Sequence, residues 1–217
     1  MIKNNEIAEN IAAILLEIKA IKLSPLNPFT WASGLRSPIY CDNRVALSYP
    51  EKRSYIKNQL VETIKNNYSD VEVIVGVATA GIPQGALVAE EMGLPFVYVR
   101  SSAKAHGMTN KIEGKLDAEQ KTVIIEDLIS TGKSSLNAVD AIRNVGAEVL
   151  GMVAIFTYGL DIAVENFENS NCDLIALSDY NAMIKKAVAD SYVTKEDEMS
   201  LLEWRKDPKK WSDGVNE

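Results

Sequence analysis

Five apolar runs of strand length, mostly separated by segments with helical spacing, constrain the fold of this chain more than any other feature. The runs cover residues 71–78, 95–100, 121–127, 148–157 and 172–178. The crossover helices are expected over residues 82–92, 134–145 and 160–170. Strands that alternate with helices in this way form a parallel sheet covered on both faces. We therefore expect an α/β fold with a central parallel sheet flanked by helices.

The segment before this alternating region predicts a small cap. Residues 1–22 have the pattern of an amphipathic helix, and turn residues break SPLNPFTWASGLRSPIYCDNR into short apolar pieces. We call this stretch, residues 24–44, the hood. The expected division is an N-terminal helix and hood over residues 1–47 and a core over residues 48–217, within one structural domain.

Other local signals place further helices and one long polar segment. Ser48 and Glu51 form a capping-box pattern that predicts the start of a helix, and Thr194 opens a last helix. Residues 101–120 are polar and lack a clear crossover-helix pattern, and long loops of this kind inside compact domains are usually functional. The final stretch, KDPKKWSDGVNE, leaves two interpretations open: a frayed tail or a cover for the hood.

Composition excludes several classes of function. A net charge of −7 opposes non-specific binding to nucleic acid. No apolar stretch is long enough to span a bilayer. Cys41 and Cys172 lie far apart without a partner motif, which supports neither a disulfide framework nor a zinc site and fits a reducing compartment. We expect a cytoplasmic protein with no nucleic-acid or membrane partner, which binds a small phosphorylated molecule through its loops.

The string VIIEDLISTGKSS, residues 123–135, has the chemistry of a sugar-phosphate site. In an open parallel sheet, ligands bind beyond the carboxyl ends of the strands. Gly132 allows close approach of the backbone, hydroxyl groups in residues 130–134 donate hydrogen bonds, and the start of the following helix attracts anions. Glu126 and Asp127 are suitable acceptors for vicinal sugar hydroxyls. Ribose 5-phosphate would satisfy both halves of the string.

Other interpretations of these residues stay open. The acids could be solvated strand-end carboxylates, and the Ser/Thr/Gly cluster could be a helix cap alone. Gly132, Lys133 and Ser134 spell the end of a Walker-type nucleotide loop, but that motif needs a glycine where Asp127 stands. The turn VGVATAGIP, residues 75–83, nearly matches a dinucleotide fingerprint, yet no acid follows about 20 residues later to bind a ribose.

VIIEDLISTGKSS resembles the phosphoribosyl diphosphate motif of type I phosphoribosyltransferases. FTWASGLRSPIYCDNR and RSSAKAHG are similar to the matching segments of orotate phosphoribosyltransferases, so the likeness runs from about residue 29 to 158. The resemblance implies transfer of ribose 5-phosphate from phosphoribosyl diphosphate to orotate, which forms orotidine 5-phosphate and diphosphate in pyrimidine nucleotide (UMP) biosynthesis. The alternatives are a phosphoribosyltransferase for another base and a non-enzymatic regulator that senses phosphoribosyl diphosphate.

The resemblance also implies roles for individual residues. Catalysis is expected from Lys104, His106 and Asp127. Contacts to phosphoribosyl diphosphate are expected from Arg100, Lys104, His106, Glu126, Asp127, Leu128, Ile129, Ser130, Thr131, Gly132, Lys133 and Ser134, and contacts to orotate from Ser130 and Tyr40. The 75–83 turn corresponds to the diphosphate loop, and residues 101–120 to a lid shared across a homodimer. Mg²⁺ is expected to bind through the diphosphate, without metal ligands from the protein.

Two of these residues have simpler interpretations as well. Tyr40 could equally be a core tyrosine. His106 is the single histidine of the chain and could be a solvated surface side chain.

The chain departs from the family pattern at four positions. Many members have Lys where this sequence has Ala32, Ala80 and Ser101, and Arg where it has Tyr158. Either other cations take over these contacts or the substrate differs. The candidate replacements are Arg36, Arg44 and Lys111.

Overall fold

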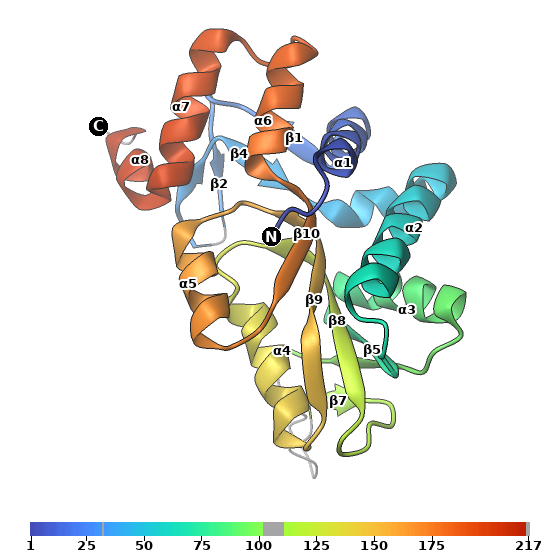
Figure 1. Cartoon of the computed structure of the whole chain (residues 1–217). Helices are drawn as coiled ribbons and strands as arrows, with labels where there is room; N and C mark the ends of the chain where they lie inside the picture. Colours follow the sequence, from blue (N-terminus) through green and yellow to red (C-terminus); the bar gives the residue numbers. More distant parts are fainter. Residues whose placement is uncertain (32, 102–110, 216–217) are drawn as a thin grey trace.

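The structure, a computed structural model, describes residues 1–31, 33–101 and 111–215. Its centre is a six-stranded sheet in the order β10-β9-β8-β5-β6-β7 (Figure 1). The strands are β5 (Val73–Val77), β6 (Phe96–Val99), β7 (Ile112–Glu113), β8 (Lys121–Ile129), β9 (Glu148–Thr157) and β10 (Leu174–Asp179). All neighbours pair in parallel except β7, which is antiparallel to β6. The predicted α/β fold is confirmed.

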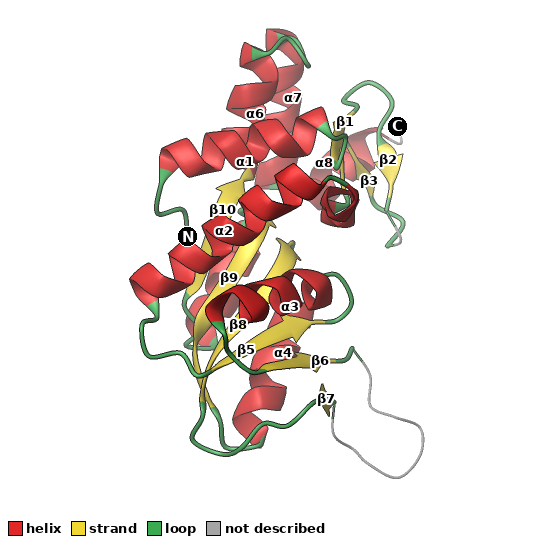
Figure 2. Ribbon diagram, turned by 90° about the vertical axis from the view of Figure 1, so that its right-hand side faces the viewer, coloured by secondary structure: helices red, strands yellow, loops and turns green. Residues whose placement is uncertain are grey.

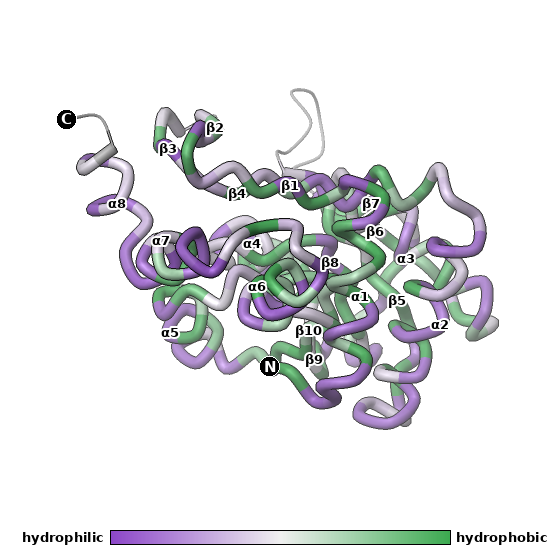
Figure 3. The backbone as a smooth tube through the Cα atoms, turned by 90° about the horizontal axis from the view of Figure 1, so that it is seen from above, coloured by the Kyte–Doolittle hydropathy of each residue, from purple (hydrophilic) through white to green (hydrophobic). Residues whose placement is uncertain are grey.

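Helices cover both faces of the sheet because its strands are apolar on both faces. All five residues of β5 are buried, and successive residues of the central strands contribute to two separate apolar clusters. One cluster lies under α1 (Asn5–Glu17), α2 (Pro50–Asn67), α3 (Gly81–Met92) and α6 (Tyr180–Ala189). The other lies under α4 (Lys133–Asn144) and α5 (Asp161–Asn169). Figures 1 and 2 show these two helical layers, and in Figure 3 hydrophilic residues line the peripheral α2.

The three crossover helices and the helix after Thr194 lie where the sequence predicts them, although that helix is not the last one. α3, α4 and α5 follow β5, β8 and β9, and Thr194 caps α7 (Lys195–Lys206) with a complete capping box to Asp197. The capping box predicted at Ser48 and Glu51 is wrong. Tyr49 precedes α2 without a side-chain cap, because Pro50 occupies the first turn with its φ already fixed and Ser48 ends a 3-10 helix.

Three further elements, α6, β7 and the C-terminal helix α8 (Pro208–Val215), were not predicted, and one strand is longer than expected. α6 follows β10 directly, and Asp179 caps it by accepting the backbone N–H of Ala182 at 2.8 Å. β7 is a two-residue strand inside the polar 101–120 segment. β8 continues beyond Asp127 to Ile129, because β9 pairs with it as far as Thr157.

The hood forms short antiparallel pairs above the sheet, β2 (Phe29–Thr30) with β3 (Arg36–Ser37), and β4 (Ile39–Cys41) with the preceding strand β1 (Ile21–Leu23). The 3-10 helix η1 (Asn43–Ser48) begins at its end. The C-terminal stretch forms α8 (Pro208–Val215), which contacts β3. Figure 2 shows α8 beside the hood, so this stretch covers the hood instead of fraying.

Within the described residues, none of the helices has the length and apolar character that crossing a bilayer requires. Buried apolar residues from α1, the hood and the core strands pack in one cluster. A division of the chain at residue 47 therefore stays a prediction.

Candidate active site

Glu126 lies inside β8 and is enclosed by the protein. It is 5% exposed, and both of its carboxylate oxygens accept hydrogen bonds. The Ser135 hydroxyl donates to one oxygen at 2.8 Å, and the backbone N–H of Asp127 donates to the other at 3.0 Å. Burial and the adjacent Asp127 carboxyl raise the pKa of Glu126 well above its usual range. The fold thus holds this acid in an environment that opposes its charge.

The backbone of Asp127 is hydrogen-bonded to the hood. Its backbone carbonyl accepts a hydrogen bond at 2.7 Å from the side chain of Asn43, which is 1% exposed. Burial raises the pKa of the Asp127 carboxyl, and a hydrogen bond with Glu126, backbone N–H groups and, to a lesser degree, the positive charge of Arg44 partly offset this. Asn43 and Ser135 thus position the acid pair. Both lie within the motif strings of the sequence, but no role was predicted for either.

The loop after the acids forms an open turn at the start of α4. Gly132 precedes the helix with a φ of +77°, and a Cβ there would lie 2.6 Å from the ring of Phe167. Both facts require glycine. No side chain caps α4, so the N–H groups of its first turn stay available, and Thr131, Lys133 and Ser134 are exposed. This geometry suits an anion such as phosphate.

The remaining residues of the predicted motif support this turn. Leu128 and Ile129 complete β8, and Ser130 is half-buried between the strand and the turn. The side chain of Asn166 on α5 donates a hydrogen bond at 2.9 Å to the carbonyl of Thr131. The turn is thus supported on its α5 side, and the acid pair on its hood side.

The start of α3 lies next to the acid pair because glycine permits close packing. A Cβ on Gly81 would lie 2.5 Å from the carbonyl oxygen of Ile125. The preceding Ala78–Thr79 peptide bond is cis, and Ala80 precedes α3 without a side-chain cap. This is the predicted diphosphate loop, and it ends at the same sheet edge as the β8 loop.

A small cavity of about 60 Å³ joins the ends of three elements at this edge. Its lining residues are Val77, Ala78, Val99, Arg100, Ser101, Ser134, Asn137 and Ala138. The structure therefore brings Arg100 and Ser134 together, as the sequence predicts. The Arg100 guanidinium lies 3.3 Å from the Glu113 carboxylate, and its backbone N–H bonds to the carbonyl of Lys111. Lys104, His106 and Ala32 lie outside the described residues.

The hood places aromatic rings over this edge. Tyr40 is 42% exposed and lies 5.8 Å from the ring of Phe29, so it is not a core residue. Trp31 stacks on Tyr158 with a centroid distance of 5.5 Å and an interplanar angle of 23°. The indole N–H of Trp31 donates to the carbonyl of Ile39 at 3.1 Å. No motif in the sequence marks Trp31 as a site residue.

Two candidate replacement cations have partners in the hood. Arg44 pairs with Asp42 through two hydrogen bonds of 2.7 and 2.9 Å, and most of its side chain is exposed. Arg36 donates to the Thr30 hydroxyl at 3.4 Å, while its Nε is enclosed without a hydrogen-bond partner in the described part of the chain. Of the two, Arg44 is electrostatically coupled to Asp127.

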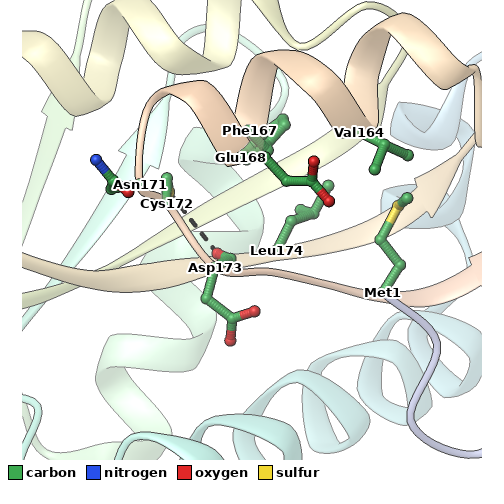
Figure 4. A pocket seen from close by; sticks show the side chains of 8 residues that line it. All are labelled: Met1, Val164, Phe167, Glu168, Asn171, Cys172, Asp173 and Leu174. Atoms are coloured by element: carbon green, nitrogen blue, oxygen red, sulfur yellow. Dashed lines mark hydrogen bonds between the residues drawn. The ribbon is translucent and has the colours of Figure 1, made fainter.

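A larger cavity of about 360 Å³ lies elsewhere, where α5 meets the start of β10 (Figure 4). Its lining residues are Met1, Val164, Phe167, Glu168, Asn171, Cys172, Asp173 and Leu174. None of the predicted site residues lines it. The acid pair and the glycine turn therefore mark the better candidate for chemistry.

Comparison with known proteins agrees with this site. Residues 54–188 match the family described as "Phosphoribosyl transferase domain". The orotate phosphoribosyltransferase of Porphyromonas gingivalis is 57% identical over 201 residues, which cover 93% of this chain and 96% of that protein. The orotate phosphoribosyltransferase of Cytophaga hutchinsonii is 54% identical over 203 residues, 94% of this chain and 97% of that protein.

The fold is similar to that of the crystal structure of orotate phosphoribosyltransferase from Aeropyrum pernix. The TM-score is 0.74 at 24% sequence identity, and the match covers 85% of this chain and 99% of that chain. This likeness confirms the predicted type I fold. From the family match and the relatives together, the chain belongs to the phosphoribosyltransferase family and, within it, to the orotate phosphoribosyltransferases.

Proposed function

We propose that this protein transfers ribose 5-phosphate from phosphoribosyl diphosphate to N1 of orotate and releases diphosphate and orotidine 5-phosphate. The observation that carries the proposal is the acid pair, buried Glu126 and half-buried Asp127, followed by an uncapped helix start at Gly132. Relatives more than half identical over nearly the whole chain are orotate phosphoribosyltransferases, which favours orotate over other bases.

The acid pair is proposed to hold the ribose. Carboxylates accept hydrogen bonds from vicinal hydroxyls, and the loop at residues 130–134 would then hold the 5-phosphate through backbone N–H groups and hydroxyls. A rigid grip on the ribose stabilises positive charge that develops at the anomeric carbon as the bond to diphosphate breaks. Ser130 and Tyr40 would place orotate against that carbon. No covalent intermediate with the protein is required.

The departing diphosphate needs positive charge, and the proposal assigns it to Arg100, Lys104 and His106. Arg100 lines the small cavity beside Ser134, which is the direction the diphosphate would take from the ribose. Lys104 and His106 belong to the proposed lid, which would exclude water and extend to the neighbouring subunit of a homodimer.

Magnesium is proposed to arrive with the diphosphate. Mg²⁺ commonly keeps several waters and binds through one or two carboxylates together with substrate phosphates. When bound, Mg²⁺ would neutralise charge on the leaving diphosphate.

The direct test mixes the purified protein with Mg²⁺, phosphoribosyl diphosphate and one base at a time. We expect the absorbance of orotate to fall as orotidine 5-phosphate forms, with adenine, hypoxanthine and uracil unchanged. Turnover of a different base would replace orotate in the proposal. Binding of phosphoribosyl diphosphate without turnover of any base would instead favour a regulator that senses this compound.

A further inference from the structure

Cys41 places a thiol where the hood meets the acid loop. Its backbone pairs with Ile21 in the antiparallel ladder of β1 and β4, and its side chain packs against the apolar cluster that includes Ile21 and Ile39. The thiol donates a hydrogen bond to Oδ1 of Asn43 at 3.4 Å. Cys41 is a free cysteine, and the proposed reaction does not use its thiol.

The Asn43 amide can hold Asp127 in one orientation. Its side chain has an acceptor end, Oδ1, and a donor end, Nδ2. Nδ2 donates to the backbone carbonyl of Asp127 at 2.7 Å, while Oδ1 accepts from Cys41. A half-turn of the amide would set Oδ1 against the Asp127 carbonyl, oxygen against oxygen. Because Asn43 is 1% exposed, water has little access to compensate for that arrangement. The thiol therefore favours the orientation that supports Asp127.

The Asp127 peptide group depends on this hydrogen bond because β5 no longer supports it. The register of β5 with β8 ends at the pair Gly76 and Ile125. The carbonyl of Asp127 lies beyond that pair and accepts its hydrogen bond from the hood instead. Cys41, Asn43 and Asp127 thus form a chain of hydrogen bonds from β4 to β8. Hydrogen bonds in such a chain polarise and strengthen one another.

The thiol must keep its proton to act as a donor, and its surroundings favour this. Burial raises the pKa of Cys41 well above its usual range, and the negative charges of Asp127 and Asp42 raise it further. A thiolate would repel Oδ1 of Asn43 and attract Nδ2, which would turn the amide away from Asp127. The protonated thiol is therefore both the favoured form and the form that the chain of hydrogen bonds requires.

We propose that Cys41 is a positioning residue for the ribose side of the site. Its thiol orients the Asn43 amide, and that amide holds the Asp127 peptide group in place. This inference rests on the proposed function, in which Asp127 binds the ribose. Because Cys41 acts through Asn43, its loss should weaken binding of phosphoribosyl diphosphate, a substrate that the thiol is not proposed to contact.

The test measures the Kd of phosphoribosyl diphosphate by calorimetry, with Mg²⁺ present and without any base. Cys41→Ala removes the donor, and we expect Kd to rise about threefold, as for the loss of one weak hydrogen bond. Cys172→Ala is the matched control. It removes the other thiol, which donates to the Asp173 carbonyl at 3.7 Å near the start of β10, and Kd should keep its wild-type value. Thermal unfolding checks that both variants are folded.

A double-mutant cycle separates orientation of Asn43 from general support of the hood. In the Asn43→Ala background, Cys41→Ala should cause no further change in Kd, because the thiol has no amide left to orient. Cys41→Ser keeps a donor and should bind more tightly than Cys41→Ala. An unchanged Kd in Cys41→Ala, or equal losses with and without the Asn43 side chain, would overturn the inference. Failure of the wild-type protein to bind phosphoribosyl diphosphate would instead overturn the proposed function.

Discussion

The acid loop and the hood meet at one edge of the sheet but are built in opposite ways. The loop is a run of nine consecutive residues, 126–134, that begins within β8, a strand with neighbours on both sides. The hood strands have two or three residues each, and the hood depends on distant contacts, such as Asn43 with Asp127 and Arg36 with Ser212. Local sequence therefore forms the site proposed for ribose and phosphate. Long-range packing forms the hood, where orotate is proposed to bind.

The largest expected effect tests the local nature of the loop. Gly132→Ala adds a Cβ that clashes with Phe167 at a φ of +77°, so the turn must move. We expect kcat/KM for phosphoribosyl diphosphate to fall about 100-fold, the loss typical of misplaced binding groups. Gly93→Ala is the matched control, since its φ is +65° and no atom lies within 4 Å of the added Cβ. Equal losses in the two variants would contradict a special role for the 132 turn.

The next prediction concerns Glu126→Gln, which should change the free energy of unfolding and the affinity for phosphoribosyl diphosphate in opposite directions. A raised folded-state pKa means that Glu126 stabilises the fold at low pH and that this stability is lost as pH rises through the raised value. Glu126→Gln removes that loss, so we expect the neutral-pH free energy of unfolding to rise by about 0.5–2 kcal/mol. The gain over wild type should shrink as pH falls, which chemical denaturation at several pH values would measure.

The same substitution should weaken binding of phosphoribosyl diphosphate about tenfold, because an amide is a poorer acceptor for ribose hydroxyls than a carboxylate. Calorimetry measures this loss. Glu148→Gln is the control, since it makes the same change at an exposed end of the neighbouring strand. A variant of Glu126 that is both less stable and fully able to bind would remove Glu126 from the ribose site.

A smaller effect tests the link between the two regions. Asn43→Ala leaves the half-buried carbonyl of Asp127 without its donor, which should cost about 1–3 kcal/mol. We expect KM to rise a few-fold for both substrates, because the hood and the acid loop lose their common contact. Asn67→Ala provides the comparison, since the Asn67 side chain donates to the Thr63 carbonyl at the exposed end of α2. A change in only one KM would mean that the regions act independently.

The smallest effect concerns the C-terminal cover of the hood. Ser212 is 2% exposed, and its hydroxyl oxygen accepts the backbone N–H of Arg36 at 2.9 Å. Ser212→Ala should cost about 1 kcal/mol and raise KM for orotate about twofold, with KM for phosphoribosyl diphosphate unchanged. Ser200→Ala removes a contact of α8 with α7 instead, and we expect no change in either KM. Unchanged orotate kinetics in Ser212→Ala would show that α8 does not support the base side.

Much of the fold could be predicted because its signals are local. The five core strands and three crossover helices have periodic or continuous apolar patterns within short windows, and burial on both faces of the sheet explains those patterns. The helix α6 was missed because its start depends on Asp179 at the very end of a strand. The capping-box prediction at Ser48 failed because Pro50 already sets the start of α2.

By itself, the sequence determined the class of fold and the acid-loop chemistry, since the residues involved are neighbours in the chain and their spacing follows from strand and helix geometry. Tertiary structure decided which distant residues complete the site. Asn43, Ser135 and the buried ring of Tyr158 acquire their positions only when the hood, α4 and β9 come together. Contacts across up to 176 residues leave no periodic trace in a sequence, because they depend on packing between elements and not on local spacing.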